Sequence, residues 1–163
     1  MRAIELTRGQ VAIVDDEDFN ELAQYRWKCC KKLYAYRYTW DGIKVCRIYM
    51  HREIMKATKG VEVDHKNLNK LDNRRENLRL CTRTENARNI PKGKRNTSGF
   101  KGVFFQNRKN PWRARIRCGE KSISLGSFKT PEEAASAYNA AATRLHGEFS
   151  NINLNIPSYG STN

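Results

Sequence analysis

The sequence predicts an α+β protein made of two small units. Strand, loop and helix patterns follow one another within 61–90, and three strand-like runs precede an alanine-rich helix within 98–154. A length of 163 residues suits two small domains, and the hydrophobic residues (39%) fall in periodic runs that favour folding over disorder. We expect a first domain over 1–90 with its core at 61–90, a linker over 91–97, a second domain over 98–154 and a tail over 155–163.

The first sixty residues predict two short strands, a helix and a β-hairpin. The strands fall at 3–6 and 10–14, and the acidic run after the second strand is placed to cap a helix. The segment 25–50 predicts a hairpin that turns at Asp41 and Gly42, a dipeptide typical of type I′ turns. A short helix follows the hairpin.

One arm of this hairpin carries aromatic side chains at alternating positions, which places them on one face of the strand. They are Tyr34, Tyr36, Tyr38 and Trp40. Such a stripe can stack on nucleic-acid bases, but it more often faces a protein core, and we predict a core face. The basic residues of the hairpin that are candidates for phosphate contacts are Arg37, Lys44 and Arg47.

The strand–loop–strand–helix segment is the most informative part of the chain. Thr82 begins a T-x-x-E capping box, so a helix starts there, and Pro91 ends it. This order places Asp64 and His65 at the end of the first strand, opposite Asn86 on the first turns of the helix. The three side chains therefore form a candidate site.

This segment resembles the HNH nuclease motif, the ββα-metal fold of homing endonucleases. The matching letters are V-D-H at 63–65, E-N-L at 76–78 and T-R-T-E-N at 82–86, in the form of the phage homing-endonuclease branch. The resemblance implies that Asp64 and Asn86 bind a metal ion and that His65 is the general base. It also implies that Asn77 holds the loop that presents His65.

These residue types suit phosphodiester hydrolysis. A neutral imidazole can take a proton from water near pH 7. One divalent cation neutralises charge on the phosphate and helps the leaving oxygen. A carboxylate and an amide oxygen are hard ligands, which favours Mg²⁺, with Mn²⁺ as the other candidate, over Zn²⁺.

The same letters also have a structural interpretation. A D-H pair is common, and Asn-rich loops often serve only to make turns. We favour an active site over an inactive copy because the three anchors occur together at consistent spacing in the matching frame. His51, whose His-Arg pair before the D-H strand is similar to that of HNH homing endonucleases, is expected to be a buried support rather than a phosphate contact.

The distribution of charge indicates a polyanionic partner. The net charge is +14; residues 25–60 hold 10 basic and 2 acidic side chains, and residues 91–163 hold 12 and 4. The excess therefore flanks the candidate site on both sides, which solubility alone does not require.

Five cysteines without regular spacing indicate reduced thiols. The chain begins without the apolar stretch of a signal peptide, and no apolar run is long enough to span a membrane. We expect no membrane partner and a cytoplasmic location in a bacterial or phage-infected cell.

The segment 91–97 is basic and turn-rich, without apolar periodicity. It either connects the two domains or lies as an arm in the minor groove of DNA. The clustering of Lys92, Lys94 and Arg95 favours groove contact.

The second domain predicts three strands, at 100–106, 112–118 and 121–126, and then a helix capped by Thr130 with Pro131 at its first position. The alanines of this helix allow close packing on the sheet. The central strand divides its residues between two faces: Trp112, Ala114, Ile116 and Cys118 toward the helix, and Arg113, Arg115 and Arg117 away from it. Each of these guanidinium groups can pair with guanine or grip a phosphate.

The second domain resembles the AP2/ERF DNA-binding domain over about 98–154. The matching pieces are F-K-G-V at 100–103, W-R-A-R-I at 112–116, S-L-G-S-F at 124–128, T-P-E-E-A-A-S-A-Y at 130–138, H-G-E at 146–148 and N-I-N at 151–153. That family places its sheet in the major groove, which implies DNA contacts by Lys101, Trp112, Arg113, Arg115 and Arg117. Phe104, Ser122 and Ser124 stand where plant members carry Arg and Trp, so the plant base preference does not transfer.

Together these features predict a site-directed DNA endonuclease of the homing type, with one unit that cuts and one that finds the site. One motif supplies one active centre, so a monomer nicks one strand of duplex DNA, and double-strand cleavage needs a transient dimer or a second event. Two alternatives remain: a DNA-binding regulator with a vestigial nuclease fold, and a nuclease directed at RNA.

Overall fold

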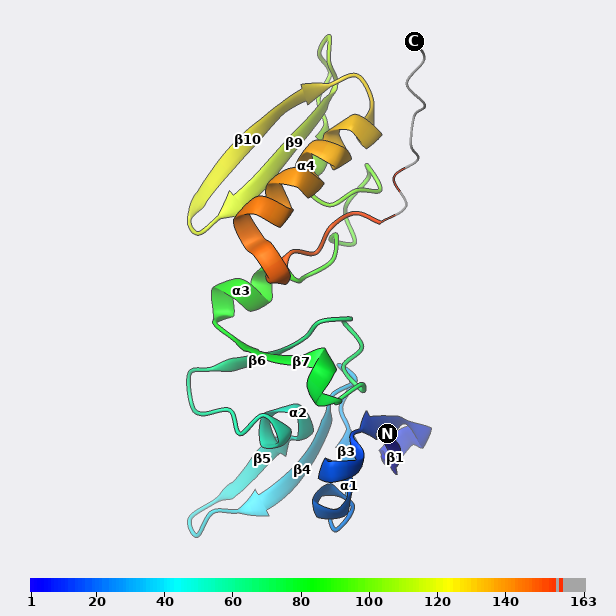
Figure 1. Cartoon of the computed structure of the whole chain (residues 1–163), viewed down its shortest axis with the longest axis vertical. Coiled ribbons are helices and arrows are strands. Elements are labelled where there is room, and N and C mark those ends of the chain that lie inside the picture. Colours follow the sequence, from blue (N-terminus) through cyan, green and yellow to red (C-terminus); the bar gives the residue numbers. More distant parts are fainter. Residues whose placement is uncertain (155, 157–163) are drawn as a thin grey trace. The chain divides into compact units, whose positions relative to one another are not determined.

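The computed structural model describes residues 1–154 and 156; the rest of the predicted tail, 155 and 157–163, lies outside the described residues. The chain is α+β, as predicted, with small antiparallel sheets and few helices (Figure 1). It divides into two compact units, Met1–Asn86 and Ala87–Asn163. None of the helices in the described part is both long and apolar enough for a membrane span.

The first unit contains three small antiparallel sheets, β1–β2, β3–β4–β5 and β6–β7. Its elements in chain order are β1 (Arg2–Glu5), the 3-10 turn η1 (Thr7–Gly9), β2 (Val11–Val14), α1 (Asp16–Leu22), β3 (Lys28–Cys29), β4 (Ala35–Trp40), β5 (Val45–Tyr49), α2 (Met50–Ile54), β6 (Glu62–His65), the 3-10 turn η2 (Arg75–Asn77), β7 (Leu78–Cys81) and the start of α3 (Arg83–Arg88). α2 packs against β4, β5 and β6, so it connects the hairpin to the strand that carries the candidate site (Figure 1).

Buried apolar side chains from several segments join these small sheets into one core. The fully buried members include Val14, Trp27 and Met50, which come from β2, the chain before β3, and α2. Val63 and Leu78, from β6 and β7, belong to the same cluster. The two strands of the candidate site are therefore anchored in the core of the first unit.

The predicted hairpin forms, but its turn and its faces differ from our predictions. Trp40 pairs with Val45, so the turn spans four residues, and only Gly42 in it has a positive φ (96°), whereas a type I′ turn needs two. The turn is held instead by the Asp41 carboxylate, which accepts hydrogen bonds from the backbone N–H groups of Ile43 and Lys44.

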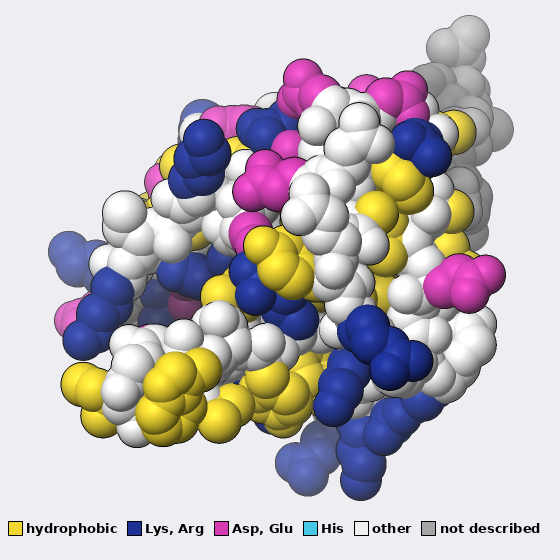
Figure 2. Space-filling view, turned by 90° about the horizontal axis from the view of Figure 1, so that it is seen from below, with side chains coloured by type: hydrophobic (Ala, Val, Ile, Leu, Met, Phe, Trp, Pro, Cys, Tyr) yellow, Lys and Arg dark blue, Asp and Glu magenta, His cyan; other side chains and the backbone are white. Residues whose placement is uncertain are grey.

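The prediction that the aromatic stripe faces the core is wrong for Tyr38 and Trp40, while Tyr34 and Tyr36 are half-buried. Tyr38 is 46% and Trp40 63% exposed, whereas Ala35, on the other face, is buried. Ala35 therefore lies on the face of β4 that packs toward the core, and Tyr38 and Trp40 lie on the other face. Figure 2, the view from below Figure 1, shows exposed hydrophobic side chains beside Lys and Arg side chains.

The segment 61–90 folds as strand, loop, strand and helix. β6 and β7 pair antiparallel, with Asp64 opposite Arg79 and His65 opposite Leu78. The capping box at the start of α3 is confirmed: Thr82 Oγ1 accepts from Glu85 N at 3.2 Å, and Glu85 Oε2 accepts from Thr82 N at 2.8 Å.

The second unit is a three-stranded antiparallel sheet with one long helix. Its elements are β8 (Val103–Phe105), β9 (Trp112–Cys118), β10 (Lys121–Phe128), α4 (Pro131–His146) and the 3-10 turn η3 (Gly147–Phe149), with sheet order β10–β9–β8. Thr130 caps α4 by accepting from Glu133 N at 3.2 Å, as predicted. The predicted alanine face packs on the sheet, because Ala134, Ala135 and Ala142 are fully buried.

The segment 91–97 belongs to the second unit by its contacts, since Asn96 Nδ2 donates to Phe100 O at 2.7 Å. Lys92 Nζ donates to Gly99 O at 2.6 Å, which holds part of the segment against the following residues. Lys94 and Arg95 remain exposed.

Replacing Gly102 with Ala is expected to destabilise the second unit by roughly 2–5 kcal/mol. Gly102 has a φ of 76°, and a Cβ there would lie 2.1 Å from the Tyr138 ring and 2.8 Å from Arg115 O. Gly99→Ala is the matched control, because Gly99 has a φ of 81° but no atom within 4 Å of a Cβ. It should cost only the backbone strain, about 1–2 kcal/mol. Urea unfolding measures both, and equal losses would show that Tyr138 moves aside freely.

Candidate functional site

Asp64 sits in a buried ion pair on β6. Arg79, its neighbour on β7, donates from Nε and Nη2 to Asp64 Oδ2 at 2.9 and 2.6 Å. Asp64 and Arg79 are 5% and 9% exposed. Strand alternation places Glu62 on the same face of β6 as Asp64, and Val63 and His65 on the other. The register of the two strands therefore orients the carboxylate.

His65 is held at the end of the same strand. Its Nε2 lies 3.3 Å from Asn73 Oδ1. Because an amide oxygen only accepts, Nε2 carries the hydrogen and Nδ1 is the nitrogen that can take a proton. Burial lowers the pKa of His65 below its ordinary value, although the Asn73 hydrogen bond opposes that shift. The imidazole is thus neutral near pH 7, the state a general base requires.

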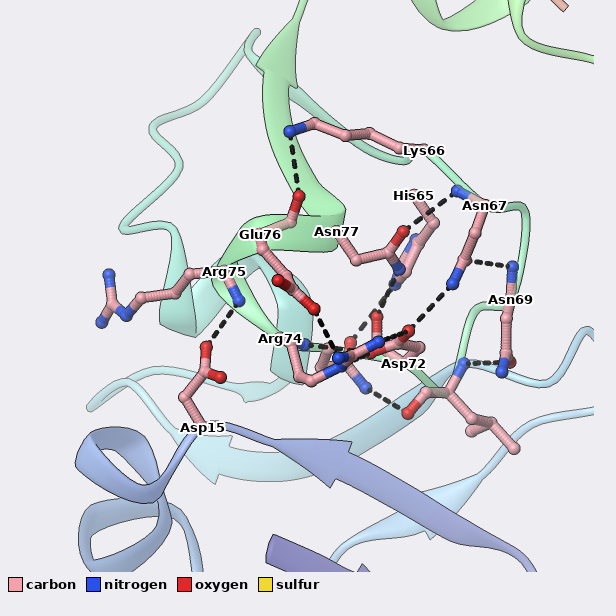
Figure 3. Close-up of polar contacts among 12 residues, drawn as sticks. Asp15, His65, Lys66, Asn67, Asn69, Asp72, Arg74, Arg75, Glu76 and Asn77 are labelled. Atoms are coloured by element: carbon pink, nitrogen blue, oxygen red, sulfur yellow. Dashed lines mark hydrogen bonds and ion pairs between the residues drawn. The ribbon is translucent and has the colours of Figure 1, made fainter. Parts of the chain in front are cut away.

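Asn77 fastens the loop between the two strands (Figure 3). Its Oδ1 accepts from Asn67 N at 3.0 Å, and its Nδ2 donates to Asp72 O at 2.7 Å. The loop is closed further by Arg74, which donates to the carboxylate of Asp72 at 2.8 Å. Asn77 is 5% exposed, and both ends of its amide are hydrogen-bonded to the loop.

Asn86 comes from α3 and meets the β6 strand. Its Nδ2 donates to Glu62 Oε2 at 2.5 Å, across 24 residues of sequence. Since Glu62 and Asp64 share a face of β6, the bond brings the Asn86 amide to the face that carries the Asp64 carboxylate. The structure thus brings Asn86 to the face of β6 that carries Asp64, while alternation places His65 on the other face of the strand.

The donor set fits a hard divalent cation. Carboxylate and amide oxygens are the ligands that Mg²⁺ and Mn²⁺ prefer. Within residues 1–154 and 156, no three His, Cys, Asp or Glu side chains lie close enough to hold an ion by themselves. An ion held by Asp64 and Asn86 would therefore complete its shell with water and phosphate oxygens, as expected of Mg²⁺.

A basic cavity of about 480 Å³ lies beside this site. Glu62 and Asn86 contribute to its wall. The other lining residues are Cys30, Lys31, Lys32, Tyr34, Arg47, Tyr49, His51, Arg52 and Val63. Four cationic side chains around one opening favour a phosphate group as its occupant.

His51 is a buried residue in the wall of this cavity. It is 8% exposed, and its ring centroid lies 5.2 Å from those of Tyr34 and His65. Burial, with smaller effects of His65 and Arg52, lowers the pKa of His51 to about 3, so the ring is neutral. The predicted supporting role fits this packing.

The two hairpin arginines predicted to contact DNA differ in their availability. Arg37 is committed to the fold: its guanidinium pairs with Glu53 at 2.6 Å and stacks over Tyr25 at 4.0 Å. The DNA contact of Arg37 stays a prediction, made for a side chain that Glu53 and Tyr25 hold against the first unit. Arg47 stays exposed, stacked over Tyr36 and hydrogen-bonded to Tyr38 Oη at 3.1 Å.

In the second unit, Arg113, Arg115 and Arg117 share the sheet face away from α4, as predicted. Arg115 stacks over Phe104 at 5.1 Å, and Arg113 donates to Gln106 and Ser124. Arg115 and Arg117 are exposed and line a shallow cavity of about 450 Å³.

Two other side chains predicted to contact DNA, Lys101 and Trp112, also make contacts within the second unit, and their DNA contacts stay predictions. Lys101 Nζ donates to Arg88 O and Ile90 O at 2.7 and 2.6 Å, and burial lowers the pKa of its amine to about 8. It caps the end of α3 instead of facing outward. Trp112 is partly buried against the core of the second unit, and its ring centroid lies 5.3 Å from that of Phe105.

Sequence reasoning missed three side chains that shape the site: Glu62, Asn73 and Arg79. Strand alternation around Asp64 would have indicated Glu62, and antiparallel pairing would have indicated Arg79. No local signal indicates Asn73, because its contact with His65 depends on the path of the loop.

Comparisons with known proteins agree with this geometry. The family model described as HNH endonuclease matches residues 49–88. A protein of Acanthamoeba polyphaga mimivirus named as an uncharacterized HNH endonuclease is 31% identical over 143 residues, which cover 87% of this chain and 74% of that protein. Protein 3.8 of Escherichia phage T7 is 34% identical over 91 residues, 56% of this chain and 74% of its own length.

A different group of relatives consists of plant transcription factors. An ethylene-responsive transcription factor of Arabidopsis thaliana is 34% identical over 111 residues, 65% of this chain and 67% of its own length. No solved structure matches the chain. The β6–β7–α3 site and the match across three quarters of the mimivirus protein together show that the chain belongs to the HNH endonuclease family, with an AP2/ERF-like second unit.

Proposed function

We propose that this protein is a site-directed DNA endonuclease of the homing type that hydrolyses phosphodiester bonds of duplex DNA. The observation that supports the proposal is the bond from Asn86 on α3 to Glu62 on β6, the strand that carries Asp64 and His65, in the wall of a basic cavity. Family membership supports a DNA nuclease as the general activity.

Each side chain has a distinct role in this proposal. His65 takes the proton of the attacking water at Nδ1, while Asn73 holds the ring from Nε2. Asn77 keeps the loop closed behind His65 and so positions the base. Asp64 and Asn86 hold Mg²⁺, with Mn²⁺ as a substitute, and the ion when bound supplies charge neutralisation at the phosphate and at the leaving oxygen.

Target recognition falls to the second unit in this proposal. Arg115 and Arg117 are exposed on the sheet and can pair with base edges in the major groove, while Arg113, held by Gln106 and Ser124, presents a fixed guanidinium. Lys92, Lys94 and Arg95 add cationic charge before the sheet, and Arg47 adds it beside the cleavage site. One site per chain favours nicking by a monomer, with double-strand cleavage by a transient dimer.

The deciding experiment incubates the protein with supercoiled plasmid and Mg²⁺, with and without a chelator. Nicking that chelation abolishes supports the proposal. Binding of duplex DNA in gel shifts without any nicking, under Mg²⁺ and under Mn²⁺, would favour the regulator with a vestigial nuclease fold. Cleavage of structured RNA without activity on duplex DNA would favour an RNA-directed enzyme.

Arg115→Ala and Arg117→Ala are each expected to weaken binding to the preferred site by about 1–3 kcal/mol, the scale of a bidentate base contact. Gel shifts on the preferred site and on shuffled DNA measure the change. An equal loss on both sequences would identify a phosphate contact instead. Lys121→Ala is the matched control: it also removes one exposed cation from this sheet, but it lies outside the residues that line the cavity.

A further inference from the structure

Glu62 is the nearest polar neighbour of the proposed metal ligand Asn86. The Glu62 carboxylate accepts from Asn86 Nδ2 at 2.5 Å, and both residues line the basic cavity. The two positions are 24 residues apart, and only the packing of α3 against β6 brings them together. Nothing in the HNH motif letters, V-D-H, E-N-L and T-R-T-E-N, includes Glu62.

The contact has a chemical consequence for the amide. An Asn side chain offers a donor on one corner and an acceptor on the other, and rotation by half a turn exchanges them. An ionised carboxylate only accepts, so Glu62 selects the rotamer in which Nδ2 faces it. The amide oxygen, the atom that can bind a cation, then faces the other way and accepts no hydrogen bond from the described residues.

The negative charge of Glu62 can also attract a cation at the site. In the part of the chain that the structure describes, no Lys, Arg or His forms an ion pair with Glu62, unlike Asp64, which is paired with Arg79. Glu62 and Asp64 point to the same face of β6. Within residues 1–154 and 156, no third His, Cys, Asp or Glu lies close enough to Glu62 and Asp64 for the three to hold an ion directly.

We propose that Glu62 is a positioning residue for the divalent cation: it holds the Asn86 amide so that Oδ1 faces the ion, and its charge favours the cation from outside the ligand shell. This inference rests on the proposed function, because it assumes that Asn86 binds the metal. Outer partners that orient a ligand typically contribute 10–100-fold to metal affinity.

The test measures Mn²⁺ binding to the full chain without DNA, by electron paramagnetic resonance. Glu62→Ala is expected to weaken Mn²⁺ binding about 10–100-fold. Glu62→Gln keeps an acceptor for Asn86 Nδ2 and should recover part of the loss. Glu21→Gln is the matched control, because it removes one exposed carboxylate of α1 in the same unit and should leave Mn²⁺ affinity unchanged.

A second background separates orientation from a general structural effect. In Asn86→Asp the ligand is a carboxylate, whose two oxygens are equivalent, so no partner is needed to select one of them. Glu62→Ala should therefore cost less Mn²⁺ affinity in the Asn86→Asp background, where only the charge of Glu62 is lost, than in the unaltered chain. An equal loss in both backgrounds would overturn the positioning role, as would unchanged affinity in Glu62→Ala alone.

The outcomes also distinguish this inference from the proposed function. If the unaltered protein binds no Mn²⁺ and nicks no DNA, the proposed nuclease site fails. If it does both and Glu62→Ala binds Mn²⁺ normally, only the role of Glu62 fails. Nuclear magnetic resonance of the Asn86 side-chain amide gives an independent reading, since Glu62→Ala should shift these proton signals upfield as the charge-assisted hydrogen bond is lost.

Discussion

Replacing His65 with Gln is expected to reduce Mg²⁺-dependent plasmid nicking by about 10²–10⁴-fold, the usual contribution of a general base. Gln has similar bulk and can still donate to Asn73 Oδ1, but its amide cannot take a proton near pH 7. DNA binding in gel shifts should persist, because the exposed arginines proposed to contact DNA are unchanged. Single-turnover nicking at saturating protein measures the chemical step directly.

His146→Gln is the matched control for this change. His146 is also a buried histidine, 7% exposed against 4% for His65, and its Nε2 lies 2.9 Å from Arg117 O in the second unit. Its replacement should leave the nicking rate at saturating protein within a few-fold of the unaltered chain. Nicking by His65→Gln at the original rate would show that another group, or a contaminating nuclease, removes the proton.

Replacing Arg79 with Met is expected to destabilise the first unit by roughly 3–5 kcal/mol. The substitution leaves the Asp64 carboxylate, 5% exposed, without the guanidinium that donates to it at 2.6 and 2.9 Å. The cost arises because a buried charge must then lose its hydration without an opposite charge to compensate. Urea unfolding, followed by circular dichroism, gives the free energy of unfolding.

The double change Asp64→Leu with Arg79→Met separates charge from packing. Removal of both charges should recover most of the stability that Arg79→Met loses, since a buried ion pair and apolar residues of similar volume are often equivalent. The double variant should nevertheless be inactive, because it lacks the proposed metal ligand. A loss below about 1 kcal/mol in Arg79→Met would mean that other donors satisfy Asp64.

Local patterns were sufficient to predict the elements that carry the site. The T-x-x-E box at Thr82 forms because its two hydrogen bonds join residues three apart in the chain. It therefore needs no contact with a distant segment. The cap at Thr130 forms for the same reason. The alternation in 112–118 separated the arginines of β9 from Ala114 and Ile116, because side chains of a strand alternate wherever the strand lies.

The environments of long side chains were not predictable in this way. Arg37 was assigned to DNA from its residue type, and Lys101 and Trp112 from the AP2/ERF resemblance. Each contacts a partner brought in by folding: Glu53, the end of α3 and Phe105. Tyr38 and Trp40 of the aromatic stripe were assigned to the core and are exposed. The type of a side chain indicates what it can bind, but the fold decides which group contacts it.

By itself the sequence determined the α+β class, the order of the elements and the motif letters around Asp64, His65, Asn77 and Asn86, because these depend on local spacing. Only the tertiary structure decided that Arg79 pairs with Asp64, that Asn73 orients His65 and that Glu62 holds the Asn86 amide. The reason is physical: a hydrogen bond depends on distances of about 3 Å between specific atoms. For groups far apart in the chain, such distances are set by strand register, loop path and helix packing.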